Sequence, residues 1–295
     1  VVRLVGSEMC IRDRTKTDWV LVKNGVSYKR YKTMGYNPFF HNETIIYNSL
    51  KQDREIQSIF KDIDKVYFYG AGCSSPELNS IVEKALSRVF SKASINVDHD
   101  LLACALATYE GEPSISCILG TGSNSCMFDG QKLTEEVPAL GYILGDEGSG
   151  SYYGKKLLTD YLYHKLPVDI RNNFDNTFKL TKADIFDNVY MKPHANVFLA
   201  SFMRFISSMN DHPYVDKMIK NGMMHFIENH VHCFDNYQNM KAHFIGSMSY
   251  IFKNQLEYAS EKMNINLGSI IRKPIDNLVD YHIKSVSYTH LTLPT

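Results

Sequence analysis

The stretch Ile118-Leu119-Gly120-Thr121-Gly122-Ser123-Asn124 decides the fold that we expect for this chain. The apolar residues from Ser116 to Leu119 predict a strand, and this strand ends abruptly at Gly-Thr-Gly-Ser. Two glycines at that point let the backbone approach a ligand closely, while the amides and hydroxyls of the turn point outward. A turn of this kind can hold a phosphate without a lysine.

Two acidic features flank this turn. Asp100 lies upstream, and Gly145-Asp146-Glu147-Gly148-Ser149-Gly150 forms a second glycine-rich turn downstream. A carboxylate at a strand end can take the proton of a sugar hydroxyl as that hydroxyl attacks phosphorus. The combination indicates phosphoryl transfer from a nucleotide to a hydroxyl. The structural alternative is helix capping, by Asp98 or Asp100 for one helix and by Asp146 or Ser149 for another.

The composition is that of a globular protein and excludes some partners. Hydrophobic residues make up 44% of the chain, which is ample for a core. Lys+Arg and Asp+Glu number 32 each, so nothing favours a nucleic acid or an anionic membrane. No apolar run is long enough to span a bilayer. Apart from Cys10, the cysteines show no paired spacing, which favours reduced, buried thiols in a cytoplasmic protein.

Helix and strand patterns alternate along the chain in two sets. A hairpin signal at Asn24-Gly25 opens the first set, and the second set begins near residue 114. This order predicts an α/β architecture with two layered domains and a cleft between them. We expect the first domain to comprise residues 15–112 and the second to comprise residues 113–285.

The two ends of the chain look foreign to the rest. Met9-Cys10-Ile11-Arg12-Asp13 can be encoded by ATG TGT ATA AGA GAC, whose reverse complement encodes Val286-Ser287-Tyr288-Thr289-His290. This DNA resembles the transposon-end adapters used in sequencing libraries. We therefore predict that residues 1–14 and 286–295 are adapter-encoded and leave them out of functional reasoning. The genuine chain would then be truncated, and a targeting segment could have been lost with its N-terminus.

Two further segments give weaker signals of nucleotide binding. Thr15-Lys16-Thr17-Asp18 runs into a strand, and its hydroxyls could contact phosphate oxygens and a hydrated metal, although threonine is ordinary in strands. Gly246-Ser247 lies between a strand and a helix, as in nucleotide-binding crevices, although any strand-to-helix turn looks similar.

Two other segments are better explained without a ligand. His225, His230, His232 and Cys233 lack the spacing of ligands on one helix face, so we predict no metal there. Gly70-Ala71-Gly72-Cys73 resembles a dinucleotide-binding turn, but no third glycine follows at the required place. Residue packing is the better account of that turn.

Seven motifs together resemble those of a known family. In chain order they are Thr15-Lys16-Thr17-Asp18, Gly35-Tyr36-Asn37-Pro38, Tyr69-Gly70-Ala71-Gly72-Cys73, Asp100, residues 120–124, residues 145–150 and Gly246-Ser247. The chain resembles the BadF/BadG/BcrA/BcrD-type ATPases and, within them, the N-acetylglucosamine kinase-like members, over residues 15–285. The resemblance implies the actin/hexokinase/Hsp70-like (ribonuclease H-like) fold, with two domains on related sheets and ATP in the cleft between them.

The resemblance also implies roles for single residues. Asp100 would be the general base on the 6-hydroxyl of an amino sugar, and Mg²⁺ would sit on the phosphates of ATP. The sugar would be bound by Asn37, Ser123, Asn124, Asp146 and Glu147. ATP would be bound by Thr15, Thr17, Gly120, Thr121, Gly122, Gly246 and Ser247. We expect no metal-binding side chains, and association into a homodimer stays open.

The first loop departs from the family pattern Asp-x-Gly-x-Thr-x-Thr. If Thr15 is its first threonine, Ile11 stands at the Asp position and Asp13 at the Gly position. The missing Asp would organise hydrated Mg²⁺, and Asp13 adds a carboxylate beside the phosphates. Like charges about 4 Å apart repel by about 1 kcal/mol in water and by several in a cleft. We therefore predict that this polypeptide binds ATP poorly and is close to inactive.

Two other functions stay open at this point. The first is an ATPase of the same family that drives an electron into a 2-hydroxyacyl-CoA dehydratase, which needs cysteines that bind an iron–sulfur cluster. The predicted positions of Cys73, Cys104, Cys117 and Cys126 offer no clear pair of interface ligands. The second is a sugar sensor without catalytic activity.

Overall fold

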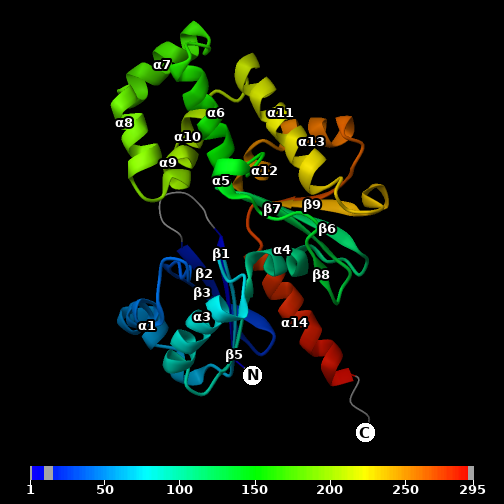
Figure 1. The fold of residues 1–295 in the computed structure, drawn as a ribbon. Coiled ribbons are helices and arrows are strands. Elements are labelled where there is room, and N and C mark those ends of the chain that lie inside the picture. Colours follow the sequence, from blue (N-terminus) through cyan, green and yellow to red (C-terminus); the bar gives the residue numbers. More distant parts are fainter. Residues whose placement is uncertain (1, 10–15, 292–295) are drawn as a thin grey trace. The chain divides into compact units, whose positions relative to one another are not determined.

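The chain folds into two compact units. The computed structural model describes residues 2–9 and 16–291, without the side chains of residues 8, 9, 60 and 285–291. Unit 1 comprises Val1–Glu112 and Lys273–Thr295, and unit 2 comprises Pro113–Arg272. Each unit contains one five-stranded sheet with helices packed on it (Figure 1).

The sheet of unit 1 has the strand order β3-β2-β1-β4-β5. Its strands are β1 (Val2–Met9), β2 (Lys16–Lys23), β3 (Val26–Met34), β4 (Lys65–Gly70) and β5 (Ser94–His99). The first three strands pair antiparallel through two hairpins, whereas β1, β4 and β5 are parallel. The carboxyl ends of β1, β3, β4 and β5 therefore meet at one edge of the sheet.

The sheet of unit 2 repeats this topology in the order β10-β9-β6-β7-β8. Its strands are β6 (Ser114–Leu119), β7 (Ser123–Phe128), β8 (Leu133–Thr134), β9 (Lys241–Ile245) and β10 (Asn266–Ile271). Again the first three strands are antiparallel, and β6, β9 and β10 are parallel. The two units thus contain related sheets, as expected for the actin-like fold, and the β6–β7 pair corresponds to the β1–β2 pair.

Five α-helices belong to unit 1. They are α1 (Glu43–Gln52), α2 (Arg54–Gln57), α3 (Pro76–Val89), α4 (Asp100–Thr108) and α14 (Ile275–Leu291). On one face of the sheet, Leu4, Trp19 and Phe68 pack with Ile46 of α1 and Leu86 of α3. The other face carries α4 and α14.

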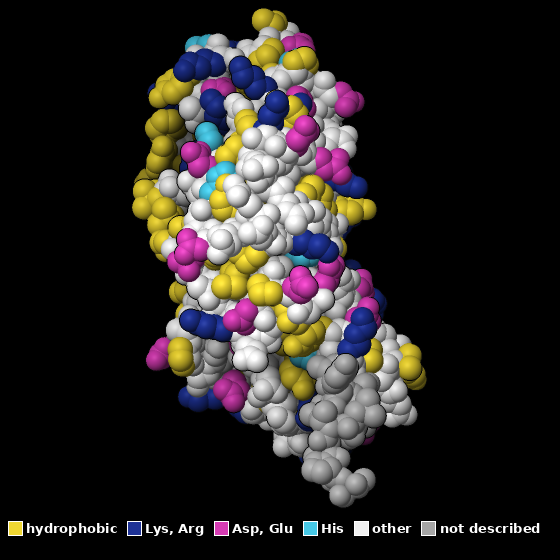
Figure 2. All heavy atoms as spheres, turned by 90° about the vertical axis from the view of Figure 1, so that its right-hand side faces the viewer, with side chains coloured by type: hydrophobic (Ala, Val, Ile, Leu, Met, Phe, Trp, Pro, Cys, Tyr) yellow, Lys and Arg dark blue, Asp and Glu magenta, His cyan; other side chains and the backbone are white. Residues whose placement is uncertain are grey.

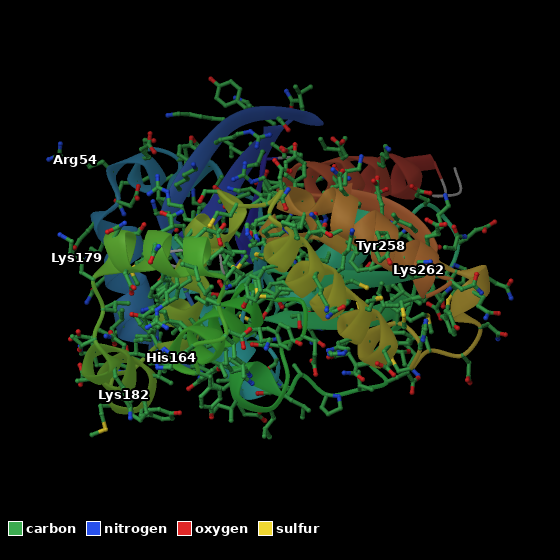
Figure 3. The ribbon with its side chains drawn as sticks, turned by 90° about the horizontal axis from the view of Figure 1, so that it is seen from above. Arg54, His164, Lys179, Lys182, Tyr258 and Lys262 are labelled. Carbon is green, nitrogen blue, oxygen red and sulfur yellow. The ribbon has the colours of Figure 1, made fainter. Side chains whose placement is uncertain are left out.

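Nine α-helices belong to unit 2. They are α5 (Gly141–Leu144), α6 (Gly150–Leu162), α7 (Val168–Phe178), α8 (Lys182–Phe186), α9 (Ala195–Ser201), α10 (Met203–Ser207), α11 (Pro213–His230), α12 (Ser247–Ile251) and α13 (Lys253–Lys262). Tyr153 of α6 and Phe226 of α11 pack on Leu119 and Phe244 of the sheet. Left-handed backbone at His164 and Lys179, both labelled in Figure 3, ends α6 and α7.

Three features differ from the sequence-based expectation or extend it. Residues 273–284 belong to unit 1 and not to the second domain, because α14 packs against α4 and the sheet of unit 1. Residues 2–9, which we predict to be adapter-encoded, form the central strand β1, whose ladder bonds use only backbone groups. The spacing of Ile46, Leu50, Ile56 and Ile59 predicts one amphipathic helix, but the structure has two, α1 and α2, and Ile59 follows them. The break lies at Asp53, whose side chain caps α2 by accepting the amides of Glu55 and Ile56.

On the face that Figure 2 shows, neither basic nor acidic side chains predominate among the described residues. Figure 2 shows basic and acidic side chains interspersed over the described part of one face, with neither sign forming a continuous patch there. This distribution fits the balanced composition of 32 basic and 32 acidic residues. Among the residues described, no helix combines the length and apolarity needed to cross a membrane.

Candidate functional site

The β6–β7 turn is held from behind by the start of α6. The amide of Gly150 donates to the carbonyl of Gly120 at 2.8 Å, and the amide of Ser151 donates to the carbonyl of Thr121 at 3.0 Å. Residues 120–124 and 145–150, which are far apart in the sequence, therefore form one structure. The turn therefore occupies these first two amides of α6. Within the turn, the amide of Gly120 donates to the carbonyl of Gly122 at 3.0 Å and the amide of Ser123 donates to Asp146. The amide of Gly122 is the candidate donor to a phosphate.

Asp146 ties the two turns together through its side chain. Its Oδ1 accepts the amide of Ser123 at 3.1 Å, and its Oδ2 accepts the hydroxyl of Ser151 at 3.3 Å. The residue is 9% exposed and has left-handed backbone with φ of 59°. Burial raises the pKa of Asp146 above its ordinary value, although the bonds from Ser123 and Ser151 act in the opposite direction. Asp146 therefore orients the β6–β7 turn, and the N-cap of α6 is Ser149.

Glu147 lies in a second polar cluster, beside the end of α11. Its Oε1 accepts the side-chain amide of Asn229 at 3.2 Å, and its Oε2 lies 3.9 Å from Nε2 of His230. Nδ1 of His230 lies 3.5 Å from the hydroxyl of Ser125 on β7, and the ring stacks on Phe226. Burial lowers the pKa of His230, and the Glu147 carboxylate opposes that effect. The lowered pKa favours the neutral imidazole of His230, which links α11, the 145–150 turn and β7.

Ser123 and Asn124 begin β7. The hydroxyl oxygen of Ser123 is buried and has no hydrogen-bond partner in the described part of the chain, and the residue is 6% exposed. Asn124 donates from Nδ2 to Glu135 at 3.1 Å and accepts the amide of Ser125 at 2.9 Å. A buried hydroxyl without a partner is uncommon and is satisfied when a ligand supplies the missing bond.

Gly246 brings a third predicted turn to the same sheet edge. It follows β9, which is parallel to β6, and its φ of +134° is a conformation that only glycine adopts readily. A Cβ at this position would lie 2.2 Å from the carbonyl oxygen of Leu119, immediately before the phosphate turn. The backbone of Gly246 therefore packs directly against the start of that turn, and Ser247 begins α12 there.

Asp100 and Asn37 belong to unit 1. Asp100 is the first residue of α4, and His99 occupies its N-cap position without a side-chain capping bond, so neither Asp98 nor Asp100 is the N-cap. Gly70 at the end of β4 pairs with His99 at the end of β5. Asn37 follows β3, and its Oδ1 accepts the amide of Phe39 at 2.9 Å. The two predicted sugar-site residues of unit 1 thus follow strands that end at the same sheet edge.

The predicted first phosphate loop is described only in part. Thr15, Ile11 and Asp13 lie outside the described residues, which leaves their roles as predictions. Thr17 is fully buried on β2, and among the described residues its hydroxyl has no hydrogen-bond partner. Asp18, the next residue, pairs with Nζ of Lys273 at 2.7 Å.

The histidines in and after α11 contact different residues. His225 lies 3.2 Å from the hydroxyl of Tyr152, and His232 lies 2.9 Å from the carbonyl of Met263. Within the described ranges, no three His, Cys, Asp or Glu side chains form a group that could hold a metal. Burial raises the pKa of the Cys117 thiol, and of Cys233 to about 11, so both are protonated at neutral pH.

Solved structures reveal a relative over nearly the whole chain. A protein from Porphyromonas gingivalis, described as a candidate N-acetylglucosamine kinase, is 36% identical, with a TM-score of 0.89 over 96% of this chain and 99% of that chain. The chain belongs to this sugar kinase family. No family model matches the sequence, and no curated protein matches it either. Membership of the BadF/BadG group therefore stays a prediction.

More distant kinases share the fold of this family. A candidate N-acetylglucosamine kinase from Chromobacterium violaceum is 13% identical, with a TM-score of 0.67 over 95% of this chain and 98% of that chain. A ROK family glucokinase from Streptomyces griseus, crystallised with glucose and AMPPNP, is 12% identical, with a TM-score of 0.58 over 95% of this chain and 98% of that chain. At this level of identity the likeness shows the fold alone.

The sequence missed two residues of this site. His230 and Asn229 contact Glu147, but we considered His230 only as a metal ligand because its neighbours in the sequence are His225, His232 and Cys233. No local pattern links α11 to the 145–150 turn. Only the fold of unit 2 brings them together.

Proposed function

We propose that this protein is an ATP-dependent kinase of the 6-hydroxyl of N-acetylglucosamine or a related amino sugar. One observation carries the proposal. Three predicted ligand-binding turns, at residues 120–124, 145–150 and 246–247, share one edge of the unit 2 sheet through direct backbone contacts. The identity of 36% to the Porphyromonas gingivalis protein supports an amino sugar as the acceptor.

In the proposed reaction, the turn at Thr121 and Gly122 binds phosphate oxygens of ATP. The sugar 6-hydroxyl oxygen attacks the γ-phosphorus while Asp100 accepts its proton. A new oxygen–phosphorus bond forms, the bond from the γ-phosphorus to its bridging oxygen breaks, and ADP leaves. A base of this kind contributes a rate factor of about 10²–10⁴.

Mg²⁺ is implied by the family resemblance. When bound, it neutralises phosphate charge during transfer. Asp146 and Asp18 are engaged by Ser123 and Lys273, and the described part of the chain offers no metal-binding group of three or more His, Cys, Asp or Glu side chains. Mg²⁺ would therefore depend on the phosphates of ATP.

The proposal is tested by ADP release. The chain carrying Ile11→Asp and Asp13→Gly should release ADP with N-acetylglucosamine, and the unchanged chain should be close to inactive. The panel should include glucosamine, glucose and a muramic-type sugar, since a few contacts decide between them. If the repaired chain releases no ADP with any sugar but still binds one, a sugar sensor replaces the kinase.

A further inference from the structure

Phe39 exposes an aromatic ring beside Asn37. The residue is 63% exposed, whereas Phe68 and Phe90 of the same unit are fully buried. Phe39 lies on the loop after β3, at the sheet edge where β4 and β5 also end. The next residue, Phe40, is 62% exposed, so two adjacent aromatic side chains are exposed there. Contiguous apolar surface in water at a candidate site marks a surface that a ligand can cover.

The loop that carries this ring is held by hydrogen bonds. Oδ1 of Asn37 accepts the amide of Phe39 at 2.9 Å. The backbone carbonyl of Asn37 accepts the amides of Phe40 at 3.1 Å and of His41 at 3.0 Å. A side-chain-closed turn of this type fixes the backbone, so the ring is presented without a large ordering cost on binding.

Gly72 lets this loop approach the β4–α3 loop. Its φ is +87°, and a Cβ there would lie 2.5 Å from Oδ1 of Asn37 and 2.9 Å from Cδ2 of Phe39. Both side chains therefore lie against the backbone of Gly72. Gly70, two residues earlier, pairs with His99, which immediately precedes Asp100. The exposed ring, the Asn37 amide and the proposed base thus follow neighbouring strand ends of one unit.

We propose that Phe39 determines specificity by packing against the N-acyl group of the acceptor sugar. This inference rests on the proposed function and deepens it. An acetamido methyl supplies an apolar surface that glucose and glucosamine lack, while Asn37 can bind a neighbouring hydroxyl. Apolar contact of this size discriminates between substrates by about 10–200-fold.

Sugar binding to the full chain tests the proposal, with calorimetry of N-acetylglucosamine and of glucose. Phe39→Ala should weaken N-acetylglucosamine binding by about tenfold and change glucose binding by less than about twofold. Phe39→Leu should retain part of the preference. The matched control is Tyr28→Ala, because Tyr28 is 71% exposed on β3 of the same unit. It should leave both affinities unchanged.

The outcomes separate this inference from the proposed function. If Phe39→Ala weakens both sugars equally, or neither, while the unchanged chain binds N-acetylglucosamine, the specificity role is wrong and the kinase proposal survives. If neither the unchanged chain nor the chain carrying Ile11→Asp and Asp13→Gly binds a sugar, both proposals fail. Unfolding curves of each variant distinguish a lost contact from a lost fold.

Discussion

Replacing Asp146 by asparagine or by alanine should show whether the fold needs the charge of this side chain or only its hydrogen-bond-accepting oxygen. Asparagine keeps an oxygen that can accept the amide of Ser123, and it tolerates the φ of 59°. Because burial raises the pKa of Asp146, the folded protein disfavours the charged form, so Asp146→Asn should change the free energy of unfolding by less than about 1 kcal/mol at pH 7.

Asp146→Ala should be much more damaging. It leaves the buried amide of Ser123 without an acceptor, which costs about 1–3 kcal/mol. It also places alanine in the left-handed region, which adds roughly 1 kcal/mol. We therefore expect a total loss of about 2–4 kcal/mol.

Urea unfolding of the full chain, followed by circular dichroism, measures both variants. Trp19, the one tryptophan in the sequence, is buried in unit 1, so its fluorescence provides a second probe that should shift less. As the pH rises above 3.8, the free energy of unfolding of the wild type should fall relative to that of Asp146→Asn. The reason is that only the wild type then carries a buried charge. If asparagine destabilises as much as alanine at pH 7, the charge itself is stabilising and our account of this carboxylate is wrong.

Three further predictions concern other residues. In the repaired chain, Asp100→Asn should lower kcat for ADP release by about 10²–10⁴ with little change in KM, and near-normal turnover would exclude Asp100 as the base. Gly246→Ala should abolish ATP binding or folding, since its Cβ would lie 2.2 Å from the Leu119 carbonyl; normal ATP titration and a normal melting curve would contradict this. Burial, aided by the charge of Arg3, lowers the pKa of His282 from 6.5 to about 4. The stability that the neutral His282 ring contributes is therefore complete above pH 6.5, and it declines by about 3 kcal/mol as the pH falls to 4. In urea titrations, His282→Gln should make the free energy of unfolding depend less on pH between 4 and 6.5. An unchanged dependence on pH would rule out this role of His282.

The sequence predicted the fold well where strands end at glycines. Ile115 to Leu119 and Ala242 to Ile245 form the buried strands expected from their apolar runs, and Gly120 and Gly246 end them. Residues 273–284 could not be assigned to unit 1 from sequence, because an amphipathic helix does not specify which sheet it covers. Asp53 split one predicted helix in two, because a capping bond competes with helix continuation.

The turns of the candidate site could be predicted from the sequence, but the side-chain contacts that hold these turns could not. The glycine patterns identified residues 120–124, 145–150 and 246–247, which the fold of unit 2 joins. The roles of Asp146, held by Ser123 and Ser151, and of His230, beside Glu147, depend on contacts between distant segments. Periodicity and motif spacing carry no information on such contacts, so only the folded arrangement reveals them.

The division of the chain has a consequence for its synthesis. Unit 2 is one uninterrupted segment, Pro113–Arg272, inserted into unit 1 between α4 and α14. A ribosome therefore completes unit 2 before it makes α14, which packs against β1 and β2. Until α14 has been synthesised, part of the apolar sheet surface of nascent unit 1 stays uncovered. This intermediate without α14 is the species that would most need a chaperone.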